Sequence, residues 1–334
     1  GGISENTNAC FELATGDYYA LMDHDDLLHP SAFYEHMKVL EDKDAWFIYS
    51  DEATFQGESI NNMVTLHFKP DFAPDNLRAN NYICHFSVFD RKLLEGMELF
   101  RSQFDGSQDH DMILRLTARA KHVVHVPKLM YYWRSHKGST AADINSKTYA
   151  IDAAKGAVAD HLRSCGFKNF EIVGTKAFET IFRIKYEVIG NPKVSIIIPN
   201  KDHADDLRRC VDSILQKSTH DNFEIIIVEN NSATQEIFDY YSELLGVKYE
   251  TAVKHADGMG SGKGAGKVKI VTYNGDFNYS AINNLGVSYA TGDYLLLLNN
   301  DTEVITINWM EELLMYAQRG DVGAVGAKLY YQDM

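Results

Sequence analysis

One stretch of this sequence occurs twice, about 276 residues apart, and this repeat limits the folds that the chain can adopt. Residues 14–30 read ATGDYYALMDHDDLLHP, and residues 290–306 read ATGDYLLLLNNDTEVIT. In both copies the pattern predicts a helix that ends near a glycine, then a buried strand, then a polar acidic turn. A repeat at this long spacing indicates two related domains, because solenoid repeats follow one another every 20–50 residues or so.

The second half of the chain alternates between strand and helix patterns. Continuous apolar strands are predicted at 193–199, 223–228 and 268–272, with helices around 207–215 and 237–245 between them. Strands that are apolar on both faces and alternate with helices favour a parallel, doubly wound sheet. We therefore expect an α/β fold here.

The first half continues for a long way after its copy of the repeat. The patterns predict a helix at 31–41, a strand at 46–50, a loop-rich stretch to 81, a strand at 82–89, a helix at 107–120, a strand at 122–126, a helix at 147–165 and a strand within 177–188. The glycine and proline of the linker 190–192 then separate a first region, 1–190, from a second, 191–334.

Composition excludes several classes of protein. With 45% hydrophobic and 24% charged residues, a chain of 334 residues can bury a sizeable core and is not mainly disordered. The formal net charge of -15 disfavours the binding of nucleic acid and anionic lipid, so neither is an expected partner. No apolar run approaches the roughly 20 residues of a transmembrane helix. Four widely spaced cysteines without a metal-binding spacing predict reduced, mostly buried thiols and a cytoplasmic protein.

Polar residues follow the predicted strands of the second half. In open α/β sheets, ligands bind at the carboxyl ends of the strands. This rule brings Asn200, the turn 229–232 (ENNS) and the turn 299–301 (NND) to one edge of the sheet. We expect a binding site there.

These motifs resemble those of family 2 glycosyltransferases with the GT-A fold. The strand that ends at Pro199, the 229–232 turn and the strand that ends in Asn-Asn-Asp301 look like the first half of such an enzyme. The Asp23-His24-Asp25 turn and the segments 107–115 (SQDHDMILR) and 132–136 (YWRSH) look like the second half of another. The whole is similar to bacterial tandem glycosyltransferases that build O-antigen or capsular polysaccharide. The resemblance implies a doubly wound, mostly parallel α/β sheet in two tandem domains.

The domain boundaries depart from that resemblance. Region 1–190 matches the metal and acceptor part of a first domain, without its nucleotide-binding strands, followed by a trailing helix and strand. Region 191–334 matches the nucleotide-binding part of a second domain. We therefore expect two incomplete domains from the middle of a longer protein. The alternative is one composite, permuted domain, although a single sheet does not need both copies of the repeated strand.

The acidic turn of the first region is a candidate metal site. When a sugar leaves a nucleotide diphosphate, a divalent cation can stabilise the charge on the departing diphosphate. Carboxylates together with substrate phosphates suit Mg²⁺ or Mn²⁺. The resemblance implies that Asp25 is the direct ligand and that Asp23 lies nearer the sugar or ribose. The alternative is an acidic turn that only caps the helix after Pro30.

The acceptor hydroxyl is a weak nucleophile and benefits from a general base. Ser107 is a predicted helix N-cap, which puts Asp109 in the first helical turn. The resemblance implies that Asp109 is the base, in the place of the Asp of a Glu-Asp pair, although the pair here is Gln108-Asp109. The alternative is an acid that only favours the helix dipole. Asp111 is the neighbour most easily confused with Asp109.

Three further residues of the first region are candidates. By resemblance, His136 is a further metal ligand or diphosphate contact, and Arg134 is able to meet phosphate. His85 is a candidate for the acceptor pocket. The alternative for both histidines is a structural or exposed side chain.

In the second region, Asp301 occupies the metal-ligand place of the family motif, and asparagines replace its usual carboxylates. The amide of an asparagine still forms hydrogen bonds, but it offers a cation less negative charge than a carboxylate does. Asn230 stands where the family usually has an aspartate that contacts the base, and Glu229 is a candidate to supply the missing acid. The predicted donor-binding residues are Pro199, Asn200, Glu229, Asn230, Asn299 and Asn300.

The sequence thus predicts a metal-dependent, inverting glycosyltransferase of bacterial cell-surface polysaccharide synthesis. Its donor would be a UDP- or dTDP-sugar, and its acceptor a glycan or a lipid-linked saccharide. The full-length protein is expected in the cytoplasm, with a peripheral place at the inner face of the plasma membrane as a further expectation. The alternative is a catalytically inactive fragment that binds a glycan or a partner enzyme.

Overall fold

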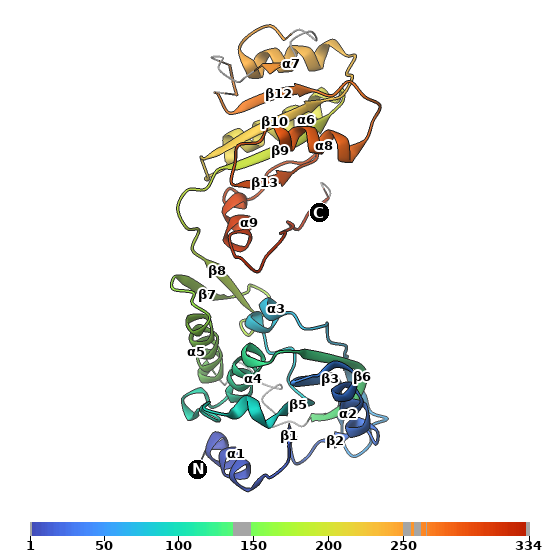
Figure 1. Cartoon of the computed structure of the whole chain (residues 1–334), viewed down its shortest axis with the longest axis vertical. Helices are drawn as coiled ribbons and strands as arrows, with labels where there is room; N and C mark the ends of the chain where they lie inside the picture. The colour runs from blue at the N-terminus through green and yellow to red at the C-terminus, as the bar shows by residue number, and fades with distance from the viewer. Residues whose placement is uncertain (1, 136–147, 250–254, 257–261, 265, 332–334) are drawn as a thin grey trace. The chain divides into compact units, whose positions relative to one another are not determined.

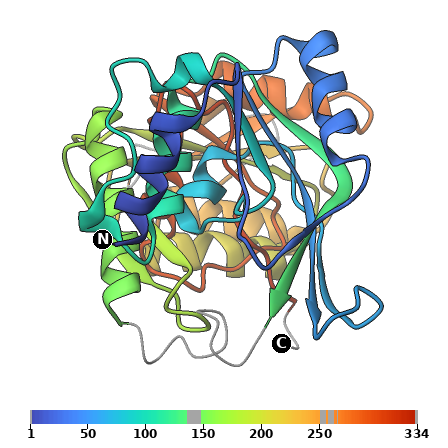
Figure 2. The same ribbon diagram turned by 90° about the horizontal axis from the view of Figure 1, so that it is seen from below.

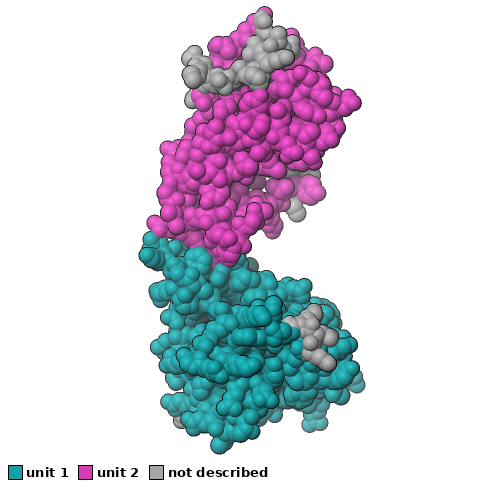
Figure 3. Space-filling view, viewed as in Figure 1, with its two compact units in different colours: residues 1–185 teal, residues 186–334 magenta. Residues whose placement is uncertain are grey.

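The computed structural model of the chain describes residues 2–135, 148–249, 255–256, 262–264 and 266–331. These residues fall into two compact units, Gly1–Lys185 (unit 1) and Tyr186–Met334 (unit 2), which Figure 3 shows in different colours. Each unit has helices and a large sheet of its own, so both are α/β. In the part of the chain described, no helix is both long enough and apolar enough to cross a bilayer.

Unit 2 is built on a sheet with the strand order β11-β12-β10-β9-β13. Among its described strands, β12, β10, β9 and β13 run parallel, and β11 pairs antiparallel with β12. The strands are β9 (Val194–Asn200), β10 (Phe223–Glu229), β11 (His255–Ala256), β12 (Val268–Thr272) and β13 (Tyr294–Leu297). The parallel α/β arrangement predicted for this half of the chain is confirmed.

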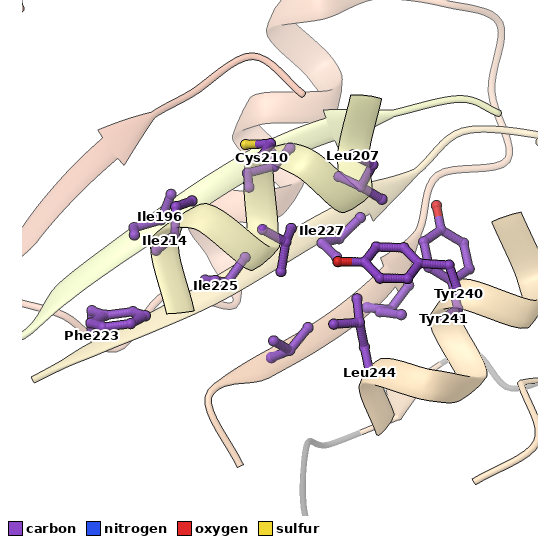
Figure 4. Packing of buried hydrophobic residues seen from close by; sticks show 14 of the residues in the cluster. Ile196, Leu207, Cys210, Ile214, Phe223, Ile225, Ile227, Tyr240, Tyr241 and Leu244 are labelled. Carbon is purple, nitrogen blue, oxygen red and sulfur yellow. The ribbon is translucent and has the colours of Figure 1, made fainter. Parts of the chain in front are cut away.

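Helices bury both faces of this sheet. On one face Ile196 and Ile225 pack with residues of α6, α7 and α9, as Figure 4 shows for α6 and α7. On the other face Ile197 and Ile226 pack against Ile282 of α8. Strands buried in this way gain about 25 cal/mol for each Å² of apolar surface removed from water, which explains their continuous isoleucine runs. The helices are α6 (Ala204–Lys217), α7 (Gln235–Leu245), α8 (Tyr279–Ser288) and α9 (Trp309–Ala317).

Unit 1 has a different sheet, with the strand order β1-β5-β3-β6-β2 and with β4 also paired to β3. The β3–β6 pair is parallel, whereas the pairs β1–β5, β3–β5, β3–β4 and β2–β6 are antiparallel. The expectation of a mostly parallel sheet is therefore wrong for this unit. The short connection 57–62 between β3 and β4 forces them antiparallel, because a parallel pair needs a crossover of a dozen or more residues. The strands are β1 (Tyr18–Leu21), β2 (Leu27–Leu28), β3 (Phe47–Gln56), β4 (Met63–His67), β5 (Ser87–Asp90) and β6 (Val123–Ser135).

Several bounds in unit 1 differ from the predicted ones. β3 and β6 are longer than predicted, because β3 pairs with β6 along its whole length. Of the strand predicted at 82–89, only the part that belongs to β5 forms a strand. Residues 81–86 are not paired in the sheet. The stretch predicted as loop-rich contains β4 and a short helix. The strand predicted within 177–188 is β8 (Phe182–Tyr186), which pairs with the unpredicted β7 (Phe170–Gly174).

The helices of unit 1 are α1 (Ile3–Leu13), α2 (Ala32–Lys43), α3 (Pro74–Ala79), α4 (Gln108–Arg119) and α5 (Thr148–Ser164), with short 3-10 helices at Arg91–Leu94 and Ser102–Phe104. Two of them, α4 and α5, line the cavity of its candidate site. α4 buries Met112, Ile113 and Leu116, as predicted. It packs against α5 (Figures 1 and 2). This packing fixes the N-terminal turn of α4.

The sequence repeat forms the same elements twice. β1 and β13 occupy matching positions of the two copies, and so do α1 and α8. The repeated strands nevertheless pair differently, because β13 lies parallel beside β9 whereas β1 lies antiparallel beside β5. The two copies are members of separate hydrogen-bonded sheets. In the described residues they therefore do not share one composite sheet.

A buried carboxylate ties β10 to its neighbours in unit 2. Glu224 is 4% exposed. It accepts hydrogen bonds from the Ser195 hydroxyl at 2.7 Å, from the backbone and hydroxyl of Thr291 at 2.7 and 2.8 Å, and from Lys269 Nζ at 2.8 Å. Burial alone would raise the pKa of this carboxyl, but these hydrogen bonds outweigh burial and lower it to about 2. The ionised carboxylate therefore stabilises the folded state.

Glu224→Gln is expected to lower the free energy of unfolding at neutral pH by about 2 kcal/mol, because it removes the charge that these donors stabilise. The folded pKa lies below the unfolded value of 4.5, so this contribution is complete above that pH and is lost as the pH falls toward about 2. Urea titrations of wild type and variant, at about pH 7 and about pH 3, measure it.

The matched control is Asp239→Asn, which changes an exposed acid that accepts a hydrogen bond from Gln235 on α7. The difference between wild type and Glu224→Gln should shrink at the lower pH. An equal difference at both pH values contradicts the stabilising role of the ionised carboxylate.

Candidate functional site

Unit 1 places a histidine beside the predicted metal turn. β1 leads into the turn 23–26, where Asp23 is exposed and Asp25 is half-buried. His85 Nε2 lies 3.7 Å from Asp23 Oδ2. The His85 ring also stacks on the Tyr131 ring, with the centroids 4.9 Å apart. The candidate for the acceptor pocket therefore lies next to the candidate metal turn.

The last residue of the turn, Asp26, anchors it to β6. Asp26 is 4% exposed and accepts hydrogen bonds from the Tyr131 hydroxyl and, at 2.7 Å, from the backbone N–H of Arg134. The Tyr131 hydroxyl also accepts a hydrogen bond from the backbone N–H of Asp23 at 3.2 Å. Tyr131 thus holds both ends of the turn. Burial raises the pKa of the Asp26 carboxyl, and the hydrogen bonds from Arg134 and Tyr131 oppose that shift only in part.

Arg134 braces the same turn from the side. Its Nε donates to the Asp25 carbonyl at 2.6 Å, another guanidinium nitrogen donates to the Gly57 carbonyl, and the group lies 4.5 Å from the centroid of the Phe55 ring. Two of the guanidinium nitrogens thus already donate hydrogen bonds to backbone carbonyl groups. The contact of Arg134 with phosphate stays a prediction. His136, which follows β6, lies outside the described residues.

Asp109 lies in the first turn of α4, as predicted, and is half-buried. Burial raises the pKa of its carboxyl; the nearby His85 opposes this shift, and the Asp23 carboxylate adds to it. Asp109 therefore interacts electrostatically with both His85 and the acidic turn. A carboxylate with a raised pKa is a stronger base than an ordinary one, which suits proton removal.

The residues before Asp109 orient it. Gln108 Nε2 donates to Asp109 Oδ2 at 3.0 Å, and Gln108 Oε1 accepts from the Gly106 N–H at 2.8 Å. A glutamate at this position would have no N–H to donate and would repel the Asp109 carboxylate. Ser107 holds the N-cap position, as predicted, but its hydroxyl donates to the Ala150 carbonyl at 3.0 Å and does not cap the helix.

Asp111 has different partners, although it lies on the same helix. Its side chain is 1% exposed, and the guanidinium groups of Arg101 and Arg115 bind both of its carboxylate oxygens. Arg101 also pairs with Asp160 of α5 at 2.7 Å. Asp111 therefore ties α4 to its neighbours, and its side chain is buried away from solvent.

A cavity of about 360 Å³ opens at the start of α4. Asp109 and Asn81 line one part of it, and apolar side chains such as Ile151 of α5 and Phe182 of β8 line another. Cavities of this size bind small molecules in other proteins. A substrate in this cavity would lie against Asp109.

Unit 2 brings its predicted donor residues together at the carboxyl edge of the sheet. Asn300 Nδ2 donates to Asn200 Oδ1 at 2.7 Å, and Asn200 Nδ2 donates to the Tyr241 hydroxyl at 2.9 Å. The Tyr241 hydroxyl in turn donates to Glu229 Oε2 at 2.6 Å. This chain of hydrogen bonds connects the turn after β13 to the ends of β9 and β10, at the place that the sequence predicted.

Other contacts fix the turn after β10. Glu229 also accepts from the backbone N–H and the hydroxyl of Ser232, so both of its oxygens have protein donors. Asn230 Nδ2 donates to the carbonyls of Tyr273 and Gly275, both at 3.0 Å. Pro199 is half-buried in β9. Contacts of these residues with a nucleotide stay predictions.

The acidic turn of unit 1 fits a divalent cation that takes its other ligands from a substrate. Asp23 and Asp25 offer carboxylates on an anchored turn, and His85 Nε2 lies 3.7 Å from Asp23 Oδ2. No cluster of three or more His, Cys, Asp or Glu residues in the described ranges is arranged to hold a metal alone. A cation here would therefore need diphosphate oxygens, as Mg²⁺ sites often do. In unit 2, Asn299 and Asp301 are exposed.

The sequence did not reveal the residues that hold these turns in place. Asp26 follows two other acids, and only its burial distinguishes it from them. Tyr131 and Tyr241 lie in apolar segments whose pattern predicts core residues. The available signal was that a buried tyrosine hydroxyl needs a partner. Asp202, also unpredicted, accepts hydrogen bonds from the backbone N–H groups of Ala233 and Thr234 before α7.

One family model matches most of the chain. It is described as Glycosyl transferase family 2, and it matches residues 1–97 and 195–334. These spans include the acidic turn, His85 and the candidate donor residues of unit 2. Asp109 and Arg134 lie outside them.

Curated relatives match the whole chain and are much longer than it. An uncharacterised protein, y4gI, from Sinorhizobium fredii is 38% identical over 337 residues, which is 100% of this chain and 35% of that protein. The O-antigen biosynthesis protein RfbC from Myxococcus xanthus is 33% identical over 334 residues, which is 100% of this chain and 24% of that protein. The chain thus spans between a quarter and about a third of these relatives.

Solved structures give more distant matches. A mannosyltransferase from Pyrobaculum calidifontis, in complex with GDP-Man and Mn²⁺, is 13% identical with a TM-score of 0.33, covering 54% of this chain and 46% of that one. TarS 1–349 from S. aureus, in complex with UDP-GlcNAc, is 13% identical with a TM-score of 0.38, covering 48% of this chain and 47% of that one.

Tyr131→Phe is expected to lower the free energy of unfolding by about 1–3 kcal/mol, because the buried Asp26 carboxylate loses a donor. Urea denaturation measures the change. The control is Tyr132→Phe, which removes the hydroxyl of the next residue on β6. An equal loss in both variants contradicts the anchoring role of the Tyr131 hydroxyl.

Proposed function

Because this chain belongs to glycosyl transferase family 2, we propose that it moves a sugar from a nucleotide-diphosphate donor to a saccharide acceptor. The donor is a UDP- or dTDP-sugar, and the acceptor is a glycan or a lipid-linked saccharide. The product belongs to a bacterial cell-surface polysaccharide. The 33% identity to an O-antigen biosynthesis protein over the whole chain supports this assignment of the product.

The proposed reaction inverts the configuration of the transferred sugar. Asp109 takes the proton from an acceptor hydroxyl, and the hydroxyl oxygen forms a bond to the anomeric carbon as the bond to the diphosphate breaks. The electron pair of the broken bond leaves with the diphosphate. Attack from the side opposite the leaving group accounts for the inversion. Gln108 holds the Asp109 carboxylate by a hydrogen bond of 3.0 Å during this step.

The single observation that carries the proposal is the environment of Asp109. Burial and the Asp23 carboxylate raise its pKa, and His85 opposes the shift. It also lines a cavity that a substrate can occupy. A carboxylate with a raised pKa at the wall of a cavity suits proton transfer from a bound acceptor better than it suits a purely structural role.

Asp25 and Asp23 would hold Mg²⁺ or Mn²⁺ in unit 1, with His136 as a further candidate, and Asp301 would do so in unit 2. The cation, when bound, supplies positive charge that stabilises the leaving diphosphate. The residues of the chain position it: Tyr131 and Arg134 keep the turn of unit 1 in place.

We also propose that the chain contains parts of two tandem GT-A domains, 1–190 and 191–334. The repeated strand supports this proposal, because β13 has a parallel partner in β9 and β1 has an antiparallel partner in β5. The repeated strand thus has its parallel neighbour in unit 2 and its antiparallel neighbour in unit 1, as expected if each unit holds a different part of the same kind of domain. Of the four cysteines only Cys210 is buried, so the expectation of mostly buried thiols is wrong. All four are free, which supports the expectation of a cytoplasmic protein.

Asp109→Asn is expected to lower sugar transfer by about 100- to 10,000-fold, because an amide cannot accept the proton of the acceptor hydroxyl. Radiolabelled transfer from UDP- and dTDP-sugars to saccharide acceptors measures the rate. The matched control is Asp205→Asn, which changes an exposed acid in the first turn of α6. If both variants keep full activity, Asp109 is not the base. If the folded wild type binds a saccharide but transfers no sugar, the chain is the inactive binding fragment.

Calorimetric titration of UDP and dTDP is expected to show binding that requires Mn²⁺. Asp301→Asn should weaken it about tenfold or more, because the cation loses a carboxylate ligand. Asp205→Asn is again the control. Binding that does not change with Mn²⁺ or with Asp301→Asn contradicts the proposed metal place in unit 2.

A further inference from the structure

A buried lysine holds the segment that carries His85. The Lys69 side chain is 0% exposed. Its ammonium group donates to Glu52 Oε2 at 3.0 Å, to the Ile83 carbonyl at 2.5 Å and to the His85 carbonyl. An ammonium group has three N–H donors and no acceptor, so these three partners use all of its hydrogen bonds.

The segment needs such a partner because it has no ladder of its own. Residues 81–86 precede β5 and are neither strand nor helix. Ile83 is 0% exposed, and Cys84 has a positive φ of 39°. Buried carbonyl groups outside secondary structure must find other donors. Lys69 is that donor for the carbonyls on both sides of Cys84.

Glu52 completes the arrangement from β3. Its carboxylate accepts from Lys69, from His67 Nδ1 at 3.1 Å and from the backbone N–H of His85 at 3.3 Å. Burial alone would raise the pKa of Glu52, but the hydrogen bond from His67 and the charge of Lys69 outweigh it and lower the pKa. The charged pair Glu52–Lys69 thus holds the backbone of His85 at both its N–H and its carbonyl.

The His85 side chain connects this pair to the candidate site. Its ring stacks on Tyr131 and makes an edge contact with Trp133, with centroids 4.9 and 6.1 Å away. Its Nε2 is 3.7 Å from Asp23, and it interacts electrostatically with Asp109. A shift of the His85 backbone would therefore change the surroundings of both acids.

We propose that Lys69 is a positioning residue that sets the place of His85 beside Asp23. This inference rests on the proposed function only for its effect on sugar transfer. The placement of His85 itself is independent of any activity. Lys69 touches no substrate and acts through the backbone of residues 83 and 85.

The position of His85 is measured by NMR of the whole chain with labelled histidines. The Tyr131 ring lies nearly parallel to the His85 ring, at an angle of 17°, so its ring current sets the His85 proton resonances. His85→Gln assigns the signal. Lys69→Met and Lys69→Arg should each move it toward the position of an exposed histidine. Arg keeps the charge, but its planar fork cannot direct three hydrogen bonds as the ammonium does.

Two comparisons separate positioning from stability. Lys92→Met removes a surface lysine that is 70% exposed and lies 3.8 Å from Asp90, and it should leave the His85 signal in place. Lys69→Met leaves Glu52 buried without the charge of Lys69 and is expected to be less stable. Glu52→Gln/Lys69→Met removes that unpaired charge. Where neither of these folds by circular dichroism, Lys69→Arg carries the test.

An unshifted His85 signal in a folded Lys69 variant overturns the proposal, and so does wild-type behaviour of Lys69→Arg. Sugar transfer by the folded variants is expected to fall about 10- to 100-fold, mainly in kcat, as for other residues that orient a site. A shifted signal with unchanged transfer supports the positioning role of Lys69 and shows that sugar transfer does not depend on the place of His85. The NMR result decides the inference even if the chain transfers no sugar.

Discussion

Both candidate sites depend on a hydrogen bond made just after the repeated strand. In unit 1 the buried carboxylate of Asp26 ties the acidic turn to β6, and in unit 2 the amide of Asn300 ties the corresponding turn to Asn200 at the end of β9. A buried polar group that lost such a partner would cost about 1–3 kcal/mol, so each turn has a strongly favoured geometry. Asp23 and Asp301, which lie in these two turns, are both exposed.

Neighbouring acids of unit 1 have different roles because they have different partners. Asp109 has a neutral amide donor in Gln108, whereas two guanidinium groups bind Asp111 two residues later on the same helix. The first arrangement leaves a carboxylate at the wall of a cavity, and the second encloses one inside the protein. The same division separates exposed Asp23 from buried Asp26 within one turn. Charge alone therefore does not identify the candidate base, whereas the partners of each carboxylate do.

Local sequence patterns predict unit 2 well, since its parallel strands are apolar on both faces and helical patterns separate its main strands. They predict unit 1 less well, because β3 pairs with β6 across a long sequence separation and with β4 through a short hairpin. The same limit applies to the site. The place of Asp109 followed from a helix start, but the burial of Asp26 depends on Tyr131, 105 residues away. The hydrogen bond from Lys69 to the His85 carbonyl likewise involves a segment, 81–86, that is neither helix nor strand. No periodic sequence pattern predicts such a segment.

The two copies of the repeat differ in how they use the residues of the turn. Unit 1 has carboxylates at Asp23 and Asp25, and the matching positions of unit 2 are Asn299 and Asp301. Between the latter pair, Asn300 donates its amide N–H to Asn200, a bond that an ionised carboxylate could not make. The asparagines of unit 2 therefore do more than lower the negative charge, because one of them ties the turn to the sheet from within. Unit 1 ties its turn with the additional acid Asp26, so neither Asp23 nor Asp25 has to make that bond.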